Sequence, residues 1–276
     1  MKNTIIAAVL AAMTFAAVSC SDKKEDKPSE TENTTASEAV STEDVTDEAA
    51  TEEETEDELT KHLREKLEEN IERCVDITLQ ELPKYDIPTD WKEINNGTLK
   101  MLVPPEVSET EKEKTDSVSV ENEYQNEDNS VHIIFHYLDE WDEGWVYHPS
   151  YPDLTGEDVK AAFSELGVDY DGSRASFLKA ISSFTSDDKT AENEKAFRIA
   201  SIEKGIELGY YGSLFHNLSD GHDVYIEGGF GEYMNEDEMR VAYALIFADS
   251  NKEYSVRVEA PTKEELLMIC STLSFS

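Results

Sequence analysis

The sequence predicts an α+β fold in which an antiparallel β-sheet is packed with helices. Several runs of the chain alternate apolar and polar residues, which is the pattern of half-buried strands. Short polar turns join these runs, as in antiparallel pairs. Other runs place apolar residues at helical spacing behind capping residues. The chain of 276 residues is long enough for one substantial core and shows no internal repeat.

Residues 1–20 have the pattern of an export signal. A lysine near the start precedes an apolar run over 5–18, which is too short to span a membrane. Residues 17–20, AVSC, resemble the lipobox of bacterial lipoproteins, with Ala17 where that family usually has leucine. The resemblance implies that the Cys20 thiol receives a diacylglycerol, which gives stable membrane anchoring. The alternative is ordinary secretion, with Cys20 incidental.

Residues 21–58 are predicted to be a disordered acidic linker. They contain sixteen acidic residues and three lysines, and no Leu, Ile, Met or aromatic residue. Such a segment buries too little apolar surface to offset its chain entropy. A flexible coil of this length spans roughly 35 Å, and repulsion between like charges extends it further.

Residues 59–82 are predicted to form an amphipathic helix, with a connector that runs to residue 90. Apolar residues recur every three or four positions from Leu59 to Leu82, and Pro83 and Pro88 end the pattern. We expect this narrow stripe to pack on the folded domain. Pairing with a helix of a partner protein is the alternative.

Residues 91–276 are predicted to form the α+β domain. Thr155 and Gly167 have the positions of an N-cap and a terminating glycine. A hairpin that turns at Lys204-Gly205 is the interpretation of residues 196–215. Thr262 and Glu265 form the capping pattern of a last helix. The expected strands are 98–103, 118–124, 131–137, 223–230, 239–247 and 254–258, and the first two helices are 155–167 and 173–184.

Two segments carry a family resemblance. The early strand that ends in proline, GTLKMLVPPEVSE, and the terminal PTKEELLMICSTLSF are similar to those of the PsbP-like α/β/α sandwich. The resemblance covers roughly residues 91–276 and rests on element order. It implies a final short strand over 271–275. It also implies a role as an extrinsic assembly subunit or binding protein rather than an enzyme.

The charge of the chain argues against two classes of partner. The formal net charge is −38, and residues 59–276 alone hold 46 acidic and 20 basic side chains. A nucleic-acid partner requires clustered Lys and Arg to neutralise phosphates, so we predict none. The charge also argues against docking on anionic lipid through basic residues.

Two cysteines remain after Cys20. Cys74 and Cys270 both lie on apolar faces of predicted helices, in a protein predicted to be exported, where disulfides persist. A Cys74–Cys270 disulfide would tie the first helix to the last. Two buried thiols are the alternative.

The sequence contains no motif for a metal, a cofactor or a catalytic nucleophile. His132 and His136 would chelate a metal on a helix, but their surroundings predict a strand, which separates their Cα atoms by roughly 13 Å. His216 and His222 flank a predicted turn near an aspartate. We interpret them as loop and edge residues, with a catalytic fragment as the alternative. Accordingly we predict no catalytic residue, no cofactor and no metal.

Residues 137–151 form the densest group of aromatic and acidic side chains. Aromatic faces beside carboxylates are typical of sugar or cation sites. A loop that folds its aromatics onto the core is the alternative. The predicted ligand-binding residues are Trp141, Glu143, Trp145 and Tyr147, and Asp139, Glu140 and Asp142 are further carboxylates of this stretch.

Together these features predict a lipoprotein anchored to the outer face of the bacterial cytoplasmic membrane. It would display a binding domain to an unknown extracellular protein or ligand. One rival hypothesis is a surface hydrolase that uses the carboxylates of residues 137–151. Another is an assembly or scaffold subunit of an envelope complex that acts through the helix at 59–82.

Overall fold

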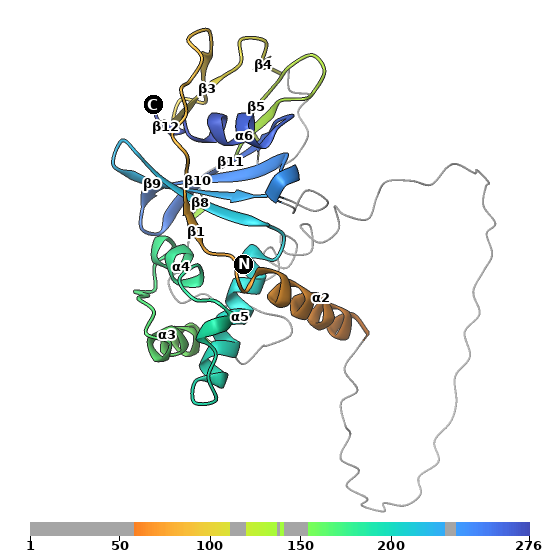
Figure 1. Ribbon diagram of the computed structural model, residues 1–276. Helices are drawn as coiled ribbons and strands as arrows, with labels where there is room; N and C mark the ends of the chain where they lie inside the picture. Colours follow the sequence, from red (N-terminus) through yellow and green to blue (C-terminus); the bar gives the residue numbers. More distant parts are fainter. Residues whose placement is uncertain (1–57, 111–119, 137–138, 141–153, 230–235) are drawn as a thin grey trace, which may run out of the picture. The chain divides into compact units, whose positions relative to one another are not determined.

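The computed structural model describes residues 58–110, 120–136, 139–140, 154–229 and 236–276 (Figure 1). Residues Glu56–Ser276 form one compact unit. The helices are α2 (Glu58–Cys74), α3 (Gly156–Glu165), α4 (Arg174–Ile181), α5 (Glu194–Leu208) and α6 (Lys263–Cys270), with short 3-10 helices at Ser186–Asp188 and Glu236–Glu238. The strands are β1 (Leu79–Glu81), β2 (Lys92–Asn95), β3 (Leu99–Val103), β4 (Ser108–Glu109), β5 (Val120–Gln125), β6 (His132–His136), β7 (Asp139–Glu140), β8 (Ser213–Ser219), β9 (His222–Gly228), β10 (Val241–Asp249), β11 (Lys252–Glu259) and β12 (Ser274–Phe275).

The described strands form two sheets. The larger has nine strands, in the order β1-β8-β9-β10-β11-β6-β5-β4, with β7 paired to β11. The smaller has the order β12-β3-β2. In the larger sheet β1 lies parallel to β8, and the other pairs are antiparallel. The predicted α+β class with an antiparallel sheet is confirmed.

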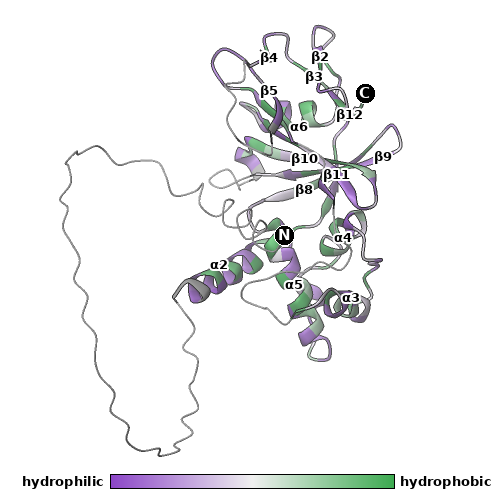
Figure 2. Ribbon diagram, turned by 180° about the vertical axis from the view of Figure 1, so that it is seen from behind, coloured by the Kyte–Doolittle hydropathy of each residue, from purple (hydrophilic) through white to green (hydrophobic). Residues whose placement is uncertain are grey.

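The larger sheet lies between two apolar layers (Figures 1 and 2). Helices α2, α3, α4 and α5 lie on one side, and α6 with the smaller sheet lies on the other. Successive side chains of a strand point to opposite faces, so β10 contributes to both cores. Ala242 and Ala244 pack with α6, whereas Leu245 and Phe247 pack with the helices of the other layer.

Local capping signals fix the helix ends that the sequence predicted. Thr155 accepts a hydrogen bond from the backbone N–H of Asp158 and forms the capping box of α3. Gly167, with φ of 72°, follows that helix. Thr262 caps α6 by accepting from the N–H of Glu265. These predictions are confirmed.

The helix predicted over 59–82 is wrong over residues 75–82, because α2 ends at Cys74. Asp76 then accepts hydrogen bonds from the N–H and hydroxyl of Ser186, and Leu79–Glu81 pair with β8 as β1. Pairing with the sheet edge therefore overrides the helical spacing of the last apolar residues. The expected packing of this helix on its own domain is confirmed, since Leu67 and Ile71 pack with Ile202 of α5.

The hairpin predicted at 196–215 is also wrong. Helix α5 occupies Glu194–Leu208, and β8 follows it. Gly205, assigned to the turn, is instead the point where α5 approaches α2 closely. A Cβ atom at this position would lie 2.6 Å from Cγ1 of Ile71. Strand β2 was not predicted. The terminal strand expected over 271–275 is present as the shorter β12.

Candidate binding groove and a buried charge cluster

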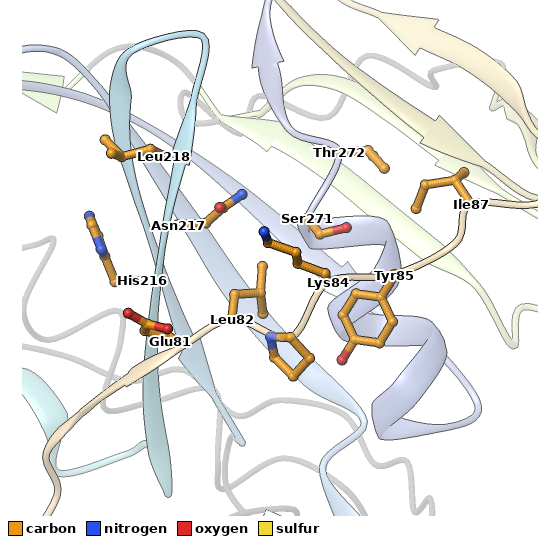
Figure 3. Close-up of a pocket in the computed structure, with 11 residues that line it drawn as sticks. Glu81, Leu82, Lys84, Tyr85, Ile87, His216, Asn217, Leu218, Ser271 and Thr272 are labelled. Carbon is orange, nitrogen blue, oxygen red and sulfur yellow. The ribbon is translucent and has the colours of Figure 1, made fainter.

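A groove of about 650 Å³ opens between the segment that follows β1, strand β8 and the end of α6 (Figure 3). This volume lies within the usual range of small-ligand sites. The three walls come from parts of the chain that are far apart in sequence. The lining residues are Glu81, Leu82, Pro83, Lys84, Tyr85 and Ile87 from the first, His216, Asn217 and Leu218 from the second, and Ser271 and Thr272 from the third.

Backbone and side-chain hydrogen bonds position these walls. The N–H of Leu82 donates to the carbonyl of His216 at 2.9 Å, which holds the connector against β8. Thr272 accepts from the N–H of Leu102 at 2.9 Å and so ties the end of α6 to β3. One backbone bond and one bond to a side-chain hydroxyl therefore hold the walls of the groove in place.

His216 is the titratable side chain of the β8 wall. Its Nε2 lies 2.7 Å from Oδ1 of Asp223, and its ring packs 5.0 Å from the ring of Tyr225. Burial would raise the pKa of Asp223, but the hydrogen bond with His216 and the charge of Lys179 hold it below its usual value. His222 points elsewhere, to the carbonyl of Phe247 at 3.0 Å. The two histidines therefore do not converge on one aspartate.

The groove combines an exposed apolar side chain with charged residues at its rim. Leu218 is 63% exposed, more than any other large hydrophobic residue of the described part of the chain. Glu81 and Lys84 are exposed beside it. The groove therefore offers one exposed apolar side chain together with charges of both signs.

A second polar feature is largely buried beneath the helical layer. Arg174, at the start of α4, places Nη2 2.5 Å from Oε1 of Glu207 on α5 and Nε 3.1 Å from Oε2 of Glu253 on β11. Burial alone would raise the pKa of Glu207, but the charge of Arg174 lowers it below its usual value. The cluster links α4, α5 and the sheet, so we assign it a structural role.

Two further glutamates of this interior have raised pKa values. Burial and the charge of Glu207 raise the pKa of Glu227 well above its usual range. Burial, with a smaller contribution from Glu207, raises the pKa of Glu203 to about 7. No periodic pattern in the sequence marks this cluster, because its members come from two helices and two strands.

The predicted strand placement of His132 and His136 is confirmed by β6. Nε2 of His132 lies 2.6 Å from Glu123 and its Nδ1 lies 3.7 Å from Glu259, on the two neighbouring strands. His136 instead stacks with Tyr243 at 6.2 Å between ring centroids. Within the described residues, no group of three His, Cys, Asp or Glu side chains has a metal-binding arrangement.

The predicted ligand-binding residues Trp141, Glu143, Trp145 and Tyr147 lie outside the described residues, as do Asp142 and Cys20. Of the same stretch, Asp139 and Glu140 are described. They form β7 and are exposed, and Glu140 lies 3.6 Å from Nζ of Lys252. These two carboxylates therefore do not line a deep pocket, which the hydrolase hypothesis required of its acids.

The predicted disulfide is not formed. Cys74 and Cys270 are free, buried thiols. Cys74 packs in the helical layer, whereas Cys270, the last residue of α6, packs on the other face of the sheet. A disulfide requires Cα atoms within about 7 Å, and the intervening sheet prevents this. None of the helices that the structure describes has the length and apolar character of a membrane span.

Neither a protein-family model nor a curated protein sequence matches this chain. Among solved structures, it is similar to the solution structure of cyanobacterial PsbP (CyanoP) from Synechocystis sp. PCC 6803. The identity is 10% and the TM-score 0.33, over 71% of this chain and 99% of that chain. So low a TM-score supports no inference, and the PsbP-like resemblance of residues 91–276 stays a prediction.

Proposed function

We propose that this chain is a bacterial lipoprotein that holds a binding domain outside the cell and captures an extracellular ligand in the groove of Figure 3. Lipid on Cys20 anchors the chain, and residues 21–57 act as a flexible spacer. The domain acts as a non-enzymatic binding module. The single observation that carries the binding role is the groove with its exposed Leu218.

The sequence supports the anchoring part of the proposal. The apolar run, the AVSC sequence and the polar residues after it occur in the order that lipoprotein export requires. Two acyl chains suffice for stable attachment, where one chain is marginal. A spacer that spans roughly 35 Å or more keeps the groove clear of the lipid headgroups.

Anchoring is tested with Cys20→Ala, which removes the acylated thiol. We expect the wild-type chain in the membrane fraction, with an intact mass that includes acyl chains, and the variant in the medium. Ser29→Ala, in the spacer, is the matched control and should behave as the wild type. Retention of the Cys20→Ala chain on cells, or an unmodified wild-type mature chain, would contradict the proposal.

The binding role is tested by photo-crosslinking on whole cells. A benzophenone amino acid replaces Leu218 in one variant and Tyr210 in another, because both side chains are exposed and Tyr210 lies just after α5, outside the groove lining. We expect adducts with extracellular material from position 218 alone. Equal adducts from both positions, or none from position 218, would overturn the groove as the capture site.

A further inference from the structure

Strand β8 has a neighbour along its whole length on one side only. Its pairing with β9 runs from Ser213 to Ser219. On the other side, β1 pairs with Leu214, Phe215 and His216 and goes no further. The last three residues of β8 therefore form an open sheet edge within the described part of the chain.

The direction of the backbone groups follows from one hydrogen bond. The carbonyl of His216 accepts from the N–H of Leu82, so the backbone groups of His216 point toward β1. Alternate residues of a strand direct these groups to the same side. Leu218, two residues later, therefore points its N–H and carbonyl away from β9 and toward the groove.

The connector leaves this edge open. After Leu82 the chain reaches Pro83, whose ring fixes φ, and it then runs toward the end of α6 (Figure 3). Within the described residues, the hydrogen bonds between this segment and β8 stop at His216. Residues that follow β1 (Leu82, Pro83 and Lys84) and the last residues of β8 (Asn217 and Leu218) line the groove together.

The charge around this edge selects the kind of partner. Glu81 is exposed and lines the groove, and exposed Asp220 directly follows the open edge in the chain, with Lys84 as the opposing charge. The folded region as a whole carries 46 acidic and 20 basic side chains. Such a field attracts cationic partners and repels anionic ones. Leu218 adds an apolar contact beside the open backbone groups.

We propose that an extended basic peptide binds here by adding a strand along β8 at residues 217–219. Its backbone pairs with the N–H and carbonyl of Leu218, its apolar residues contact the Leu218 side chain, and its basic residues face Glu81 and Asp220. This is β-augmentation, in which main-chain hydrogen bonds supply affinity. The inference rests on the proposed function, because it names the ligand class of the same groove.

The test uses the full-length chain with Cys20→Ala and a fluorescent seven-residue peptide of alternating arginine and valine. Binding is measured by fluorescence anisotropy. An N-methyl group on the central backbone nitrogen should weaken binding about tenfold, because it removes a strand hydrogen bond and leaves the side chains in place. A peptide with glutamate for arginine should not bind.

Leu218→Pro is the matching change in the protein. It removes the N–H that faces the groove and spares the pairing with β9, since proline is tolerated on the open side of an edge strand. We expect binding about tenfold weaker. Leu218→Ala keeps the N–H and should weaken binding by about threefold or less. Equal affinity of the proline variant and the wild type would overturn strand addition.

Hydrogen exchange, measured on the chain that keeps Leu218, tests the inference without the Leu218→Pro variant. The bound peptide should slow exchange of the Leu218 amide and leave the Asn217 amide, already paired with β9, unchanged. Binding that protects other groove residues and not Leu218 would overturn strand addition and leave the groove as the capture site. If the chain dimerises and the dimer slows exchange of the Leu218 amide without peptide, a second copy of the chain occupies the edge. That result would overturn the peptide as the occupant. Anchoring is judged separately, by the Cys20→Ala fractionation.

Discussion

Glu203 and Glu227 lie in the protein interior with little positive charge to balance them. Arg174 is paired with Glu207 and Glu253, so its charge is already shared. Burial therefore raises the pKa of both remaining carboxyl groups, and Glu227 in its protonated form donates a hydrogen bond to Glu207. Burial in this interior therefore favours the protonated, uncharged form of both carboxyl groups.

This arrangement predicts a stability that falls as pH rises. The pKa of Glu203 is about 7 in the folded state and about 4.3 in an unfolded chain. At pH values between these two pKa values, the folded state binds more protons than the unfolded state does. The stabilising contribution is therefore present below about pH 4.3 and is lost as pH rises through 7. Glu203→Gln should raise the free energy of unfolding at pH 8.5, relative to wild type, by about 2 kcal/mol more than at pH 5.

Urea unfolding at the two pH values measures this difference. Glu165→Gln, at an exposed position of α3, is the control and should leave the pH dependence unchanged. A Glu203→Gln variant with the same pH dependence as the wild type would show that this carboxyl is not the group that holds the proton.

At the scale of elements, the contact between α2 and α5 ties the first helix to the domain. Leu67 and Ile71 pack with Ile202, and Gly205 lets the two helices approach closely. The ammonium of Lys204 donates to the carbonyls of Val75 and Phe184 at 2.7 Å each. Because this stripe is used within the domain, it is not left open for a partner helix, as the scaffold hypothesis required.

Gly205→Ala tests this contact, because two effects on stability have opposite signs. Alanine favours a helix over glycine by about 1 kcal/mol, whereas the added Cβ would lie 2.6 Å from Ile71. We expect the clash to dominate and the free energy of unfolding to fall by about 1–3 kcal/mol. Thermal or urea unfolding measures it, with exposed Ile206→Ala as control. A neutral or stabilising effect would show that α2 shifts enough to accommodate the added Cβ atom at little cost in free energy.

At the scale of the whole molecule, the sheet separates two independent cores. Side chains of one strand alternate between them, as Ala244 and Leu245 of β10 do. Cys74 and Cys270 belong to different cores, so the fold is held by packing on both faces and not by a covalent tie. Burial raises the pKa of the Cys74 thiol to about 11 and raises that of Cys270 as well.

The thiols give a prediction for the whole chain. The Cys20→Ala chain, denatured without reductant, should take up two alkyl groups from iodoacetamide by intact mass. The folded chain should take up almost none at pH 8, because both thiols are buried and protonated. No uptake after denaturation, restored by dithiothreitol, would reveal a disulfide and contradict the separation of the two cores.

Local signals in the sequence predicted the structure correctly where a short segment determines its own conformation. The capping residues Thr155 and Thr262 begin helices as predicted, because a cap is satisfied within four residues. The alternation of apolar and polar residues also predicted β6 correctly, since burial of one face of a strand imposes a period of two. By contrast, α5 is buried on nearly every side, including Ser201 and Lys204, so no amphipathic period marked it as a helix.

The sequence by itself determined the α+β class, the antiparallel pairing and the acidic charge, because these depend on composition and short-range pattern. Only the tertiary structure decided that Leu79–Glu81 form a strand rather than the end of a helix, since β8 supplies their partner. It likewise decided the groove, whose walls come from three distant segments. Contacts between residues far apart in the chain leave no periodic trace in it, and burial against them outweighs local preference.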